Sequence, residues 1–204
     1  MIAVAVATGM LAPVLVALVL TLLVVLCWLL RVPAEVTALP SFLLLLGGFA
    51  AAFMVAGCWL ARRYPGFLQR EQGAALTSND RVAASLPVLS AGLPFLLIIM
   101  ATLRLPVANP SPVFGLGLLL VILLLGLARI ARLPALSLVA LVCMVALELA
   151  WHGRHFAPDH PWIPLAWYAG VHLLFTAYPF LFREAFRRSI LPWAAAAASG
   201  IGHF

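Results

Sequence analysis

Long apolar runs occupy most of this chain and restrict what it can fold into. They cover residues 3–30, 41–60, 82–103, 113–128, 133–150, 163–182 and 190–204. About 20 apolar residues in a helix cross the hydrocarbon core of a bilayer, and a helix satisfies its own backbone polar groups there. Charged residues make up only 9% of the chain, against about a quarter in soluble domains. We therefore predict an all-α fold: one domain over residues 1–204, a polytopic transmembrane helical bundle of about seven spans.

The basic residues between these runs predict an orientation. All of them are arginine, and the successive gaps hold one, four, one, two, one and three. Alternate gaps therefore hold nine arginines on one side and three on the other. Because cytoplasmic loops collect Lys and Arg, the N-terminus is predicted to be cytoplasmic and the C-terminus outside.

The net charge of +6 does not indicate a nucleic-acid partner. Nucleic-acid binding typically requires a basic patch or stripe. Here the arginines are spread over all the gaps and form no such stripe. We expect them to contact anionic lipid headgroups, with the lipid bilayer as the main partner.

The last run, 190–204, is short for a span. Its 15 residues give about 22 Å of helix against a hydrocarbon core of about 30 Å. We expect the chain to be a piece of a longer polytopic protein, packed against further transmembrane helices of that chain or of other subunits. In the run 41–60, Gly48, Ala52 and Ala56 recur every four positions, and small residues at this spacing favour close helix packing.

A cluster of acidic and histidine side chains follows the run 133–150. Glu148, His152, His155 and Asp159 are candidates for acid/base catalysis. If the helix continues beyond Trp151, Glu148, His152 and His155 lie at i, i+4 and i+7 on one face, a plausible spacing for a zinc-like ion. Alternatively, this is a wet interfacial loop in which Glu148 reaches outward and pairs with Arg104 or Arg154.

His172 lies near the middle of the run 163–182, where an ionisable side chain is costly. Tyr168 and Thr176 flank it at i−4 and i+4, which gives one intramembrane polar stripe along the helix. Such a stripe serves either as a proton or substrate pathway or as an interhelical hydrogen-bond ladder, and the ladder is favoured. Isolated serines, Ser90, Ser137 and Ser199, are expected to bond to carbonyls of their own helices.

Several large aromatic residues fall near the ends of the runs and are expected to form interfacial belts. They are Trp28, Trp151 and Trp162 at the outer boundary and Trp59, Tyr64, Tyr178 and Trp193 at the inner one. No nucleotide-binding loop, nucleophile elbow or Cys-x-x-Cys motif occurs. The sequence therefore implies no cofactor.

The stretch RLPVANPSPVFGLGLLLVILLLGLARI, residues 104–130, together with the Ala/Leu-rich runs and arginine-only gaps, resembles the many-span bacterial proteins known as predicted membrane proteins of unknown function. The resemblance implies a multi-pass protein of the bacterial inner (plasma) membrane, in keeping with a fragment of a longer bundle. It implies no catalytic motif.

Two functions remain open. The first is a non-enzymatic transmembrane module, either part of a transporter or an envelope scaffold. The second is a membrane-embedded enzyme that acts at the outer face on a lipid-linked or envelope substrate through the Glu/His/Asp cluster. The enzyme needs Glu148, His152, His155 and Asp159 to converge on one pocket.

Overall fold

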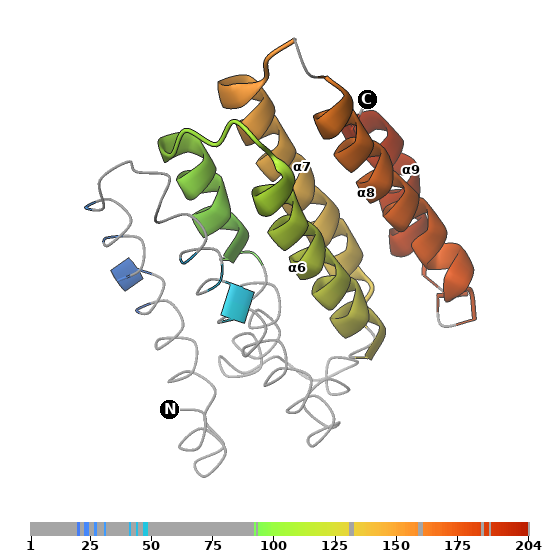
Figure 1. Cartoon of the computed structure of the whole chain (residues 1–204). Coiled ribbons are helices and arrows are strands. Elements are labelled where there is room, and N and C mark those ends of the chain that lie inside the picture. The colour runs from blue at the N-terminus through green and yellow to red at the C-terminus, as the bar shows by residue number, and fades with distance from the viewer. Residues whose placement is uncertain are drawn as a thin grey trace.

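The computed structural model describes residues 92, 94–130, 133–158, 161–184, 186, 187 and 189–203, together with positions 20, 23, 24, 27, 31, 41, 44, 47 and 48. Its elements are a helix at Pro94–Arg104, α6 (Ser111–Ile130), α7 (Ala135–His155), α8 (Trp162–Leu181) and α9 (Leu191–His203) (Figure 1). The described residues contain no strand, so the all-helical prediction is confirmed for them. Most of the expected spans 3–30, 41–60 and 82–103 lies outside the described residues.

Prolines and one asparagine mark where the helices begin. Pro134 and Pro161 directly precede α7 and α8 with φ of −62° and −71°, the value that a proline ring imposes and a first helical turn accepts. Before α6, the Asn109 side-chain oxygen accepts a hydrogen bond from the Ser111 backbone N–H at 3.0 Å. This Asx turn reverses the chain into the helix.

The four labelled helices pack side by side (Figure 1). α6 and α7 are antiparallel neighbours, as the short connection between them predicts, and the Leu133 N–H closes the turn on the Ala128 carbonyl at 3.0 Å. α9 packs against both α7 and α8, whereas α6 and α8 touch over a smaller area. The less extensive contact between α6 and α8 leaves space between these two helices.

Glycines set the closest helix contacts. A Cβ at Gly117 of α6 would lie 2.8 Å from Leu147 Cδ2 of α7, and one at Gly202 of α9 would lie 2.9 Å from Val145 Cγ2. Gly47 likewise approaches Leu116 of α6, whereas Gly48 is exposed with no atom near its Cβ position. Small residues thus allow close approach at Gly117, Gly202 and Gly47. Of the predicted stripe, Ala52 and Ala56 lie outside the described residues.

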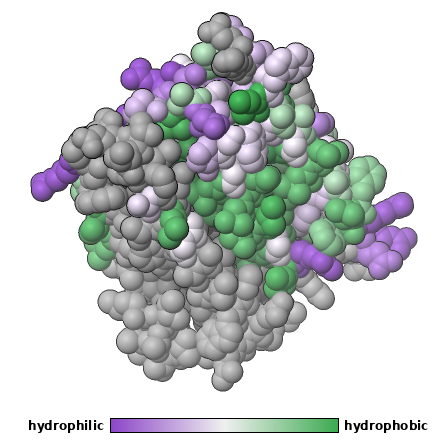
Figure 2. Space-filling view, in the orientation of Figure 1, coloured by the Kyte–Doolittle hydropathy of each residue, from purple (hydrophilic) through white to green (hydrophobic). Residues whose placement is uncertain are grey.

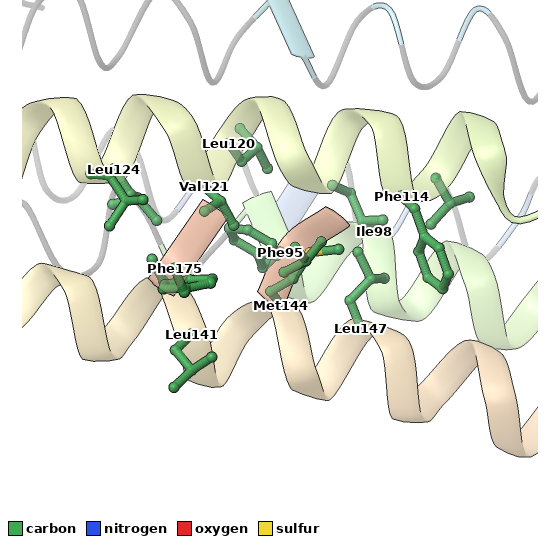
Figure 3. Close-up of a cluster of buried hydrophobic side chains, with 14 of the residues drawn as sticks. Phe95, Ile98, Phe114, Leu120, Val121, Leu124, Leu141, Met144, Leu147 and Phe175 are labelled. Carbon is green, nitrogen blue, oxygen red and sulfur yellow. The ribbon is translucent and has the colours of Figure 1, made fainter. Parts of the chain in front are cut away.

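The core lies between the helix Pro94–Arg104 and α6, α7 and α8. Figure 3 shows Phe95, Ile98, Val121, Met144 and Phe175 of these four helices turned toward one another. Each is at most 1% exposed. Bulky side chains from these four helices therefore fill the interior, and packing contacts between them hold the bundle together.

The outer surface of the helices is apolar. Side chains such as Val142, Leu149, Leu173 and Ile201 are 65% to 86% exposed, and Figure 2 shows a hydrophobic band with hydrophilic side chains gathered mainly near its ends. α6 and α7 are each long and apolar enough to cross a membrane, by length and composition. Two candidate membrane-spanning helices and this surface are compatible with a membrane protein.

Two of the predicted belt aromatics point inward instead. Trp151 is 2% exposed and its indole N–H donates to the Val107 carbonyl at 3.0 Å. Tyr178 is 5% exposed and its hydroxyl donates to the Leu125 carbonyl at 2.7 Å. The belt prediction is wrong for these two, because each ring finds a backbone acceptor inside the bundle. Trp162, another of the predicted belt residues, is by contrast 80% exposed.

Candidate functional site

The C-terminal end of α7 carries the predicted cluster. The helix continues through Gly153 to His155, so Glu148, His152 and His155 all lie on it. Trp151 anchors this extension through its bond to the Val107 carbonyl, and the helix closes where the Phe156 N–H meets the His152 carbonyl. The helical continuation on which the i, i+4, i+7 spacing depends is therefore present.

The two imidazoles reach different neighbours. His152 Nδ1 lies 3.2 Å from the Tyr168 hydroxyl of α8, and the His152 ring stacks on Phe156 with ring centroids 4.3 Å apart. His155 Nε2 donates to the Thr102 carbonyl of the helix Pro94–Arg104 at 2.7 Å. That nitrogen must carry a hydrogen, because a carbonyl only accepts. Within the part of the chain that the structure describes, no three His, Cys, Asp or Glu side chains lie close enough to hold a metal ion.

Glu148 is buried rather than outward-reaching. It is only 4% exposed. The expectation that Glu148 reaches outward is therefore wrong, because α7 turns this residue into the bundle. The fourth candidate, Asp159, and the neighbouring His160 lie outside the described residues.

Phe114 of α6 stands beside this cluster. Its ring centroid lies 5.6 Å from that of Trp151 and 5.9 Å from that of Tyr168. Both geometries are those of attractive aromatic pairs. The Tyr168 ring therefore packs among other aromatic rings, and its hydroxyl meets the exposed His152.

His172 faces a packed neighbour. Its Nδ1 lies 2.9 Å from the Ser199 hydroxyl of α9. Ser199 donates its only hydrogen to the Ala196 carbonyl at 2.7 Å, so the serine oxygen accepts from His172 and Nδ1 carries the hydrogen. A base that activates a serine accepts the proton of the serine hydroxyl. Here His172 instead donates its Nδ1 hydrogen to the Ser199 oxygen.

The three residues of the predicted polar stripe meet different neighbours. Tyr168 turns toward α7 and His172 toward α9, while the buried Thr176 Oγ1 has no hydrogen-bond partner among the described residues. Each step of four residues advances about 40° around a helix. Over eight residues the stripe therefore turns by about 80°, which is enough to bring different helices into contact.

The expected serine bonds occur where they are described. The Ser137 hydroxyl donates to the Pro134 carbonyl at 2.6 Å, and the Ser199 hydroxyl donates to the Ala196 carbonyl at 2.7 Å. Ser90 lies outside the described residues. Two features were not predicted: the second role of Ser199 as the partner of His172, and the position of Phe114 beside Tyr168. Nothing in the sequence indicates how α6 and α9 are rotated about their axes.

A comparison of the chain with protein-family models, curated proteins and solved structures found no match.

Proposed function

We propose that this protein is a non-enzymatic transmembrane module of the bacterial inner membrane, either part of a transporter or an envelope scaffold. It crosses the membrane about seven times, with the N-terminus in the cytoplasm. The observation that carries the proposal is the distribution of charge and apolar surface over the described helices. Arg104, Arg129, Arg154 and Arg183 are all exposed and lie at helix ends, and large apolar side chains are exposed between them.

Exposing such an apolar surface to water is unfavourable, whereas exposing it to lipid is not. Contiguous exposed apolar area on this scale marks an interaction with a membrane or with another protein. In a bilayer the exposed arginines would lie at the headgroups, where they cost little. Glu148 is the one buried charged residue among those described, and it faces into the bundle as intramembrane carboxylates do.

The interior favours a structural role for the mid-depth polar residues. His172 is bonded to Ser199 across the α8–α9 contact. Hydrogen bonds of this kind associate helices in lipid, where apolar burial supplies little driving force between helices. This supports a packing module more directly than a site of bond cleavage.

Membrane extraction tests the proposal. We expect the full chain, expressed in bacteria, to remain in the membrane pellet after washing with alkaline carbonate or with urea and to be released by detergent. A known peripheral protein in the same preparation provides the control, since it leaves with the carbonate wash. Release of this chain by carbonate would contradict integral insertion.

One observation favours the enzyme as a second candidate: the buried carboxylate Glu148 lies one helical turn before the exposed His152 on α7, and His152 meets the Tyr168 hydroxyl. If this end of α7 binds metal, the purified protein should contain it in stoichiometric amount. The double replacement His152→Ala and His155→Ala should then remove it, while His172→Ala keeps it. Metal-free wild-type protein would exclude the metal-dependent form of this candidate.

A further inference from the structure

A groove runs between α6 and α8 where the two helices separate. Its volume is about 600 Å³, and its walls include Leu118 and Ile122 of α6 and Ala166, Gly170 and Ala177 of α8. Gly170 is exposed and nothing lies within 4 Å of its Cβ position. The small side chains on α8 thus leave a channel open to the surroundings of the bundle.

Two aromatic side chains of α8 join it to α6 near the two ends of the groove. At one end Trp167 of α8 donates its indole N–H to the Ser111 hydroxyl of α6 at 3.2 Å. At the other, the Tyr178 hydroxyl reaches the Leu125 carbonyl. Along α8, the interval from Ala166 to Ala177 corresponds to about 16 Å at 1.5 Å per residue, which is about half of a 30 Å hydrocarbon core.

A positive charge lies where the groove face of α6 ends. Leu118, Ile122 and Gly126 are spaced at four residues and Arg129 follows at three, so the four share one side of the helix. The Arg129 guanidinium carbon lies 4.1 Å above the centre of the Phe182 ring, next to the end of α8. Stacking of this kind holds the cation in place between the two helices.

The surroundings of Arg129 add further charge. Arg183 and Arg187 follow Phe182 in the chain, and both are exposed, with Glu184 as the only acidic residue between them. Among the residues that the structure describes around Arg129, three arginines stand against one glutamate, which makes their surroundings electropositive. The charge complements an anionic headgroup, and basic positions between transmembrane helices bind such headgroups.

We propose that the α6–α8 groove binds an anionic phospholipid, with its phosphate at Arg129 and an acyl chain lying past Gly126 into the groove. The proposal rests on membrane insertion. The apolar walls match a hydrocarbon chain, the length matches one leaflet, and Arg129 stands at the level where a headgroup would lie. Gly126 leaves the path open, because no atom lies within 4 Å of its Cβ position.

Native mass spectrometry of detergent-purified protein tests this with phosphatidylglycerol and phosphatidylcholine that carry identical acyl chains. The wild-type chain should bind phosphatidylglycerol more tightly. Arg129→Gln should weaken phosphatidylglycerol binding about fivefold, since one surface arginine contributes on the order of 1 kcal/mol, and should weaken phosphatidylcholine binding less, because the choline cation offsets the charge of that lipid's phosphate. Arg154→Gln, which removes an exposed arginine at the other end of the bundle, is the matched control and should have no effect.

Gly170→Leu tests the groove itself. No atom lies within 4 Å of the Cβ position of Gly170, so the added side chain enters the groove and should lower the occupancy of both lipids. Gly153→Leu, at an equally open glycine on α7, should not. Equal phosphatidylglycerol binding by wild type and Arg129→Gln, or unchanged occupancy in Gly170→Leu, would overturn the proposal. So would a dimer that Gly170→Leu dissociates, because a second copy would then be the occupant.

Failure of the lipid site is distinguishable from failure of the proposed function. A chain that resists carbonate but shows no preference for phosphatidylglycerol overturns the lipid site alone. A chain that carbonate releases overturns both.

Discussion

At the scale of single residues, the position of His172 bears on the choice between an interhelical hydrogen-bond ladder and a proton or substrate pathway. The sequence placed it at mid-depth and favoured a hydrogen-bond ladder, and the structure bonds it to Ser199 of α9. Its partner lies 27 residues away, so no local spacing could have identified it. Trp151 shows the same limit: its position near a run's end predicted a belt, but the rotation of α7 directs it to the Val107 carbonyl.

The His172–Ser199 contact should appear as a coupling energy between two substitutions. We expect His172→Ala and Ser199→Ala to be non-additive in the free energy of unfolding in bicelles. The coupling should be about 0.6 kcal/mol and at most ~1.7, the range of interhelical hydrogen bonds in membranes. Unfolding of the single and double variants in the same bicelles measures it.

Ser137→Ala is the matched control for this cycle. Ser137 and Ser199 are both fully buried, and each donates to the carbonyl three residues before it. Only Ser199 meets His172, so the pair His172→Ala and Ser137→Ala should be additive. Equal coupling in both cycles would mean that the His172 contact contributes nothing specific.

At the scale of helices, apolar runs and prolines predicted where α6, α7 and α8 lie, because each run is long and each connection is rich in helix-breaking residues. The extension of α7 to His155 remained conditional, since Gly153 lowers helix propensity. Which face each helix buries was not predictable. α6 is apolar on nearly every side, and such a helix carries no amphipathic pattern that would indicate its rotation.

The α6–α7 contact provides a test at this scale. Gly117→Leu should destabilise the bundle by about 1–3 kcal/mol, the usual cost of overpacking, because its Cβ position is already 2.8 Å from Leu147 Cδ2. Gly126→Leu on the same helix has open space around its Cβ position and should leave stability nearly unchanged. Thermal unfolding in detergent without added lipid compares the two. A Gly117→Leu protein as stable as Gly126→Leu would contradict the close approach.

At the scale of the whole molecule, composition predicted an all-α membrane protein, and the described residues are all-helical with two helices that could cross a membrane. The orientation stays a prediction from the arginine count. The candidate site was predictable only as a set of residues on α7. Burial of Glu148 and the divergence of His152 and His155 depend on the packing of Tyr168, Phe114 and Thr102, which no sequence pattern specifies.

Cysteine labelling from outside the cell tests the membrane topology most directly. In a background with Cys27, Cys58 and Cys143 replaced by serine, Ala157→Cys and Glu184→Cys each introduce one thiol at an exposed position beyond opposite ends of α8. We expect a membrane-impermeant maleimide to label Ala157→Cys in intact cells and Glu184→Cys only after permeabilisation. Labelling of Glu184→Cys with protection of Ala157→Cys would reverse the orientation, and labelling of both in intact cells would contradict a membrane crossing by α8.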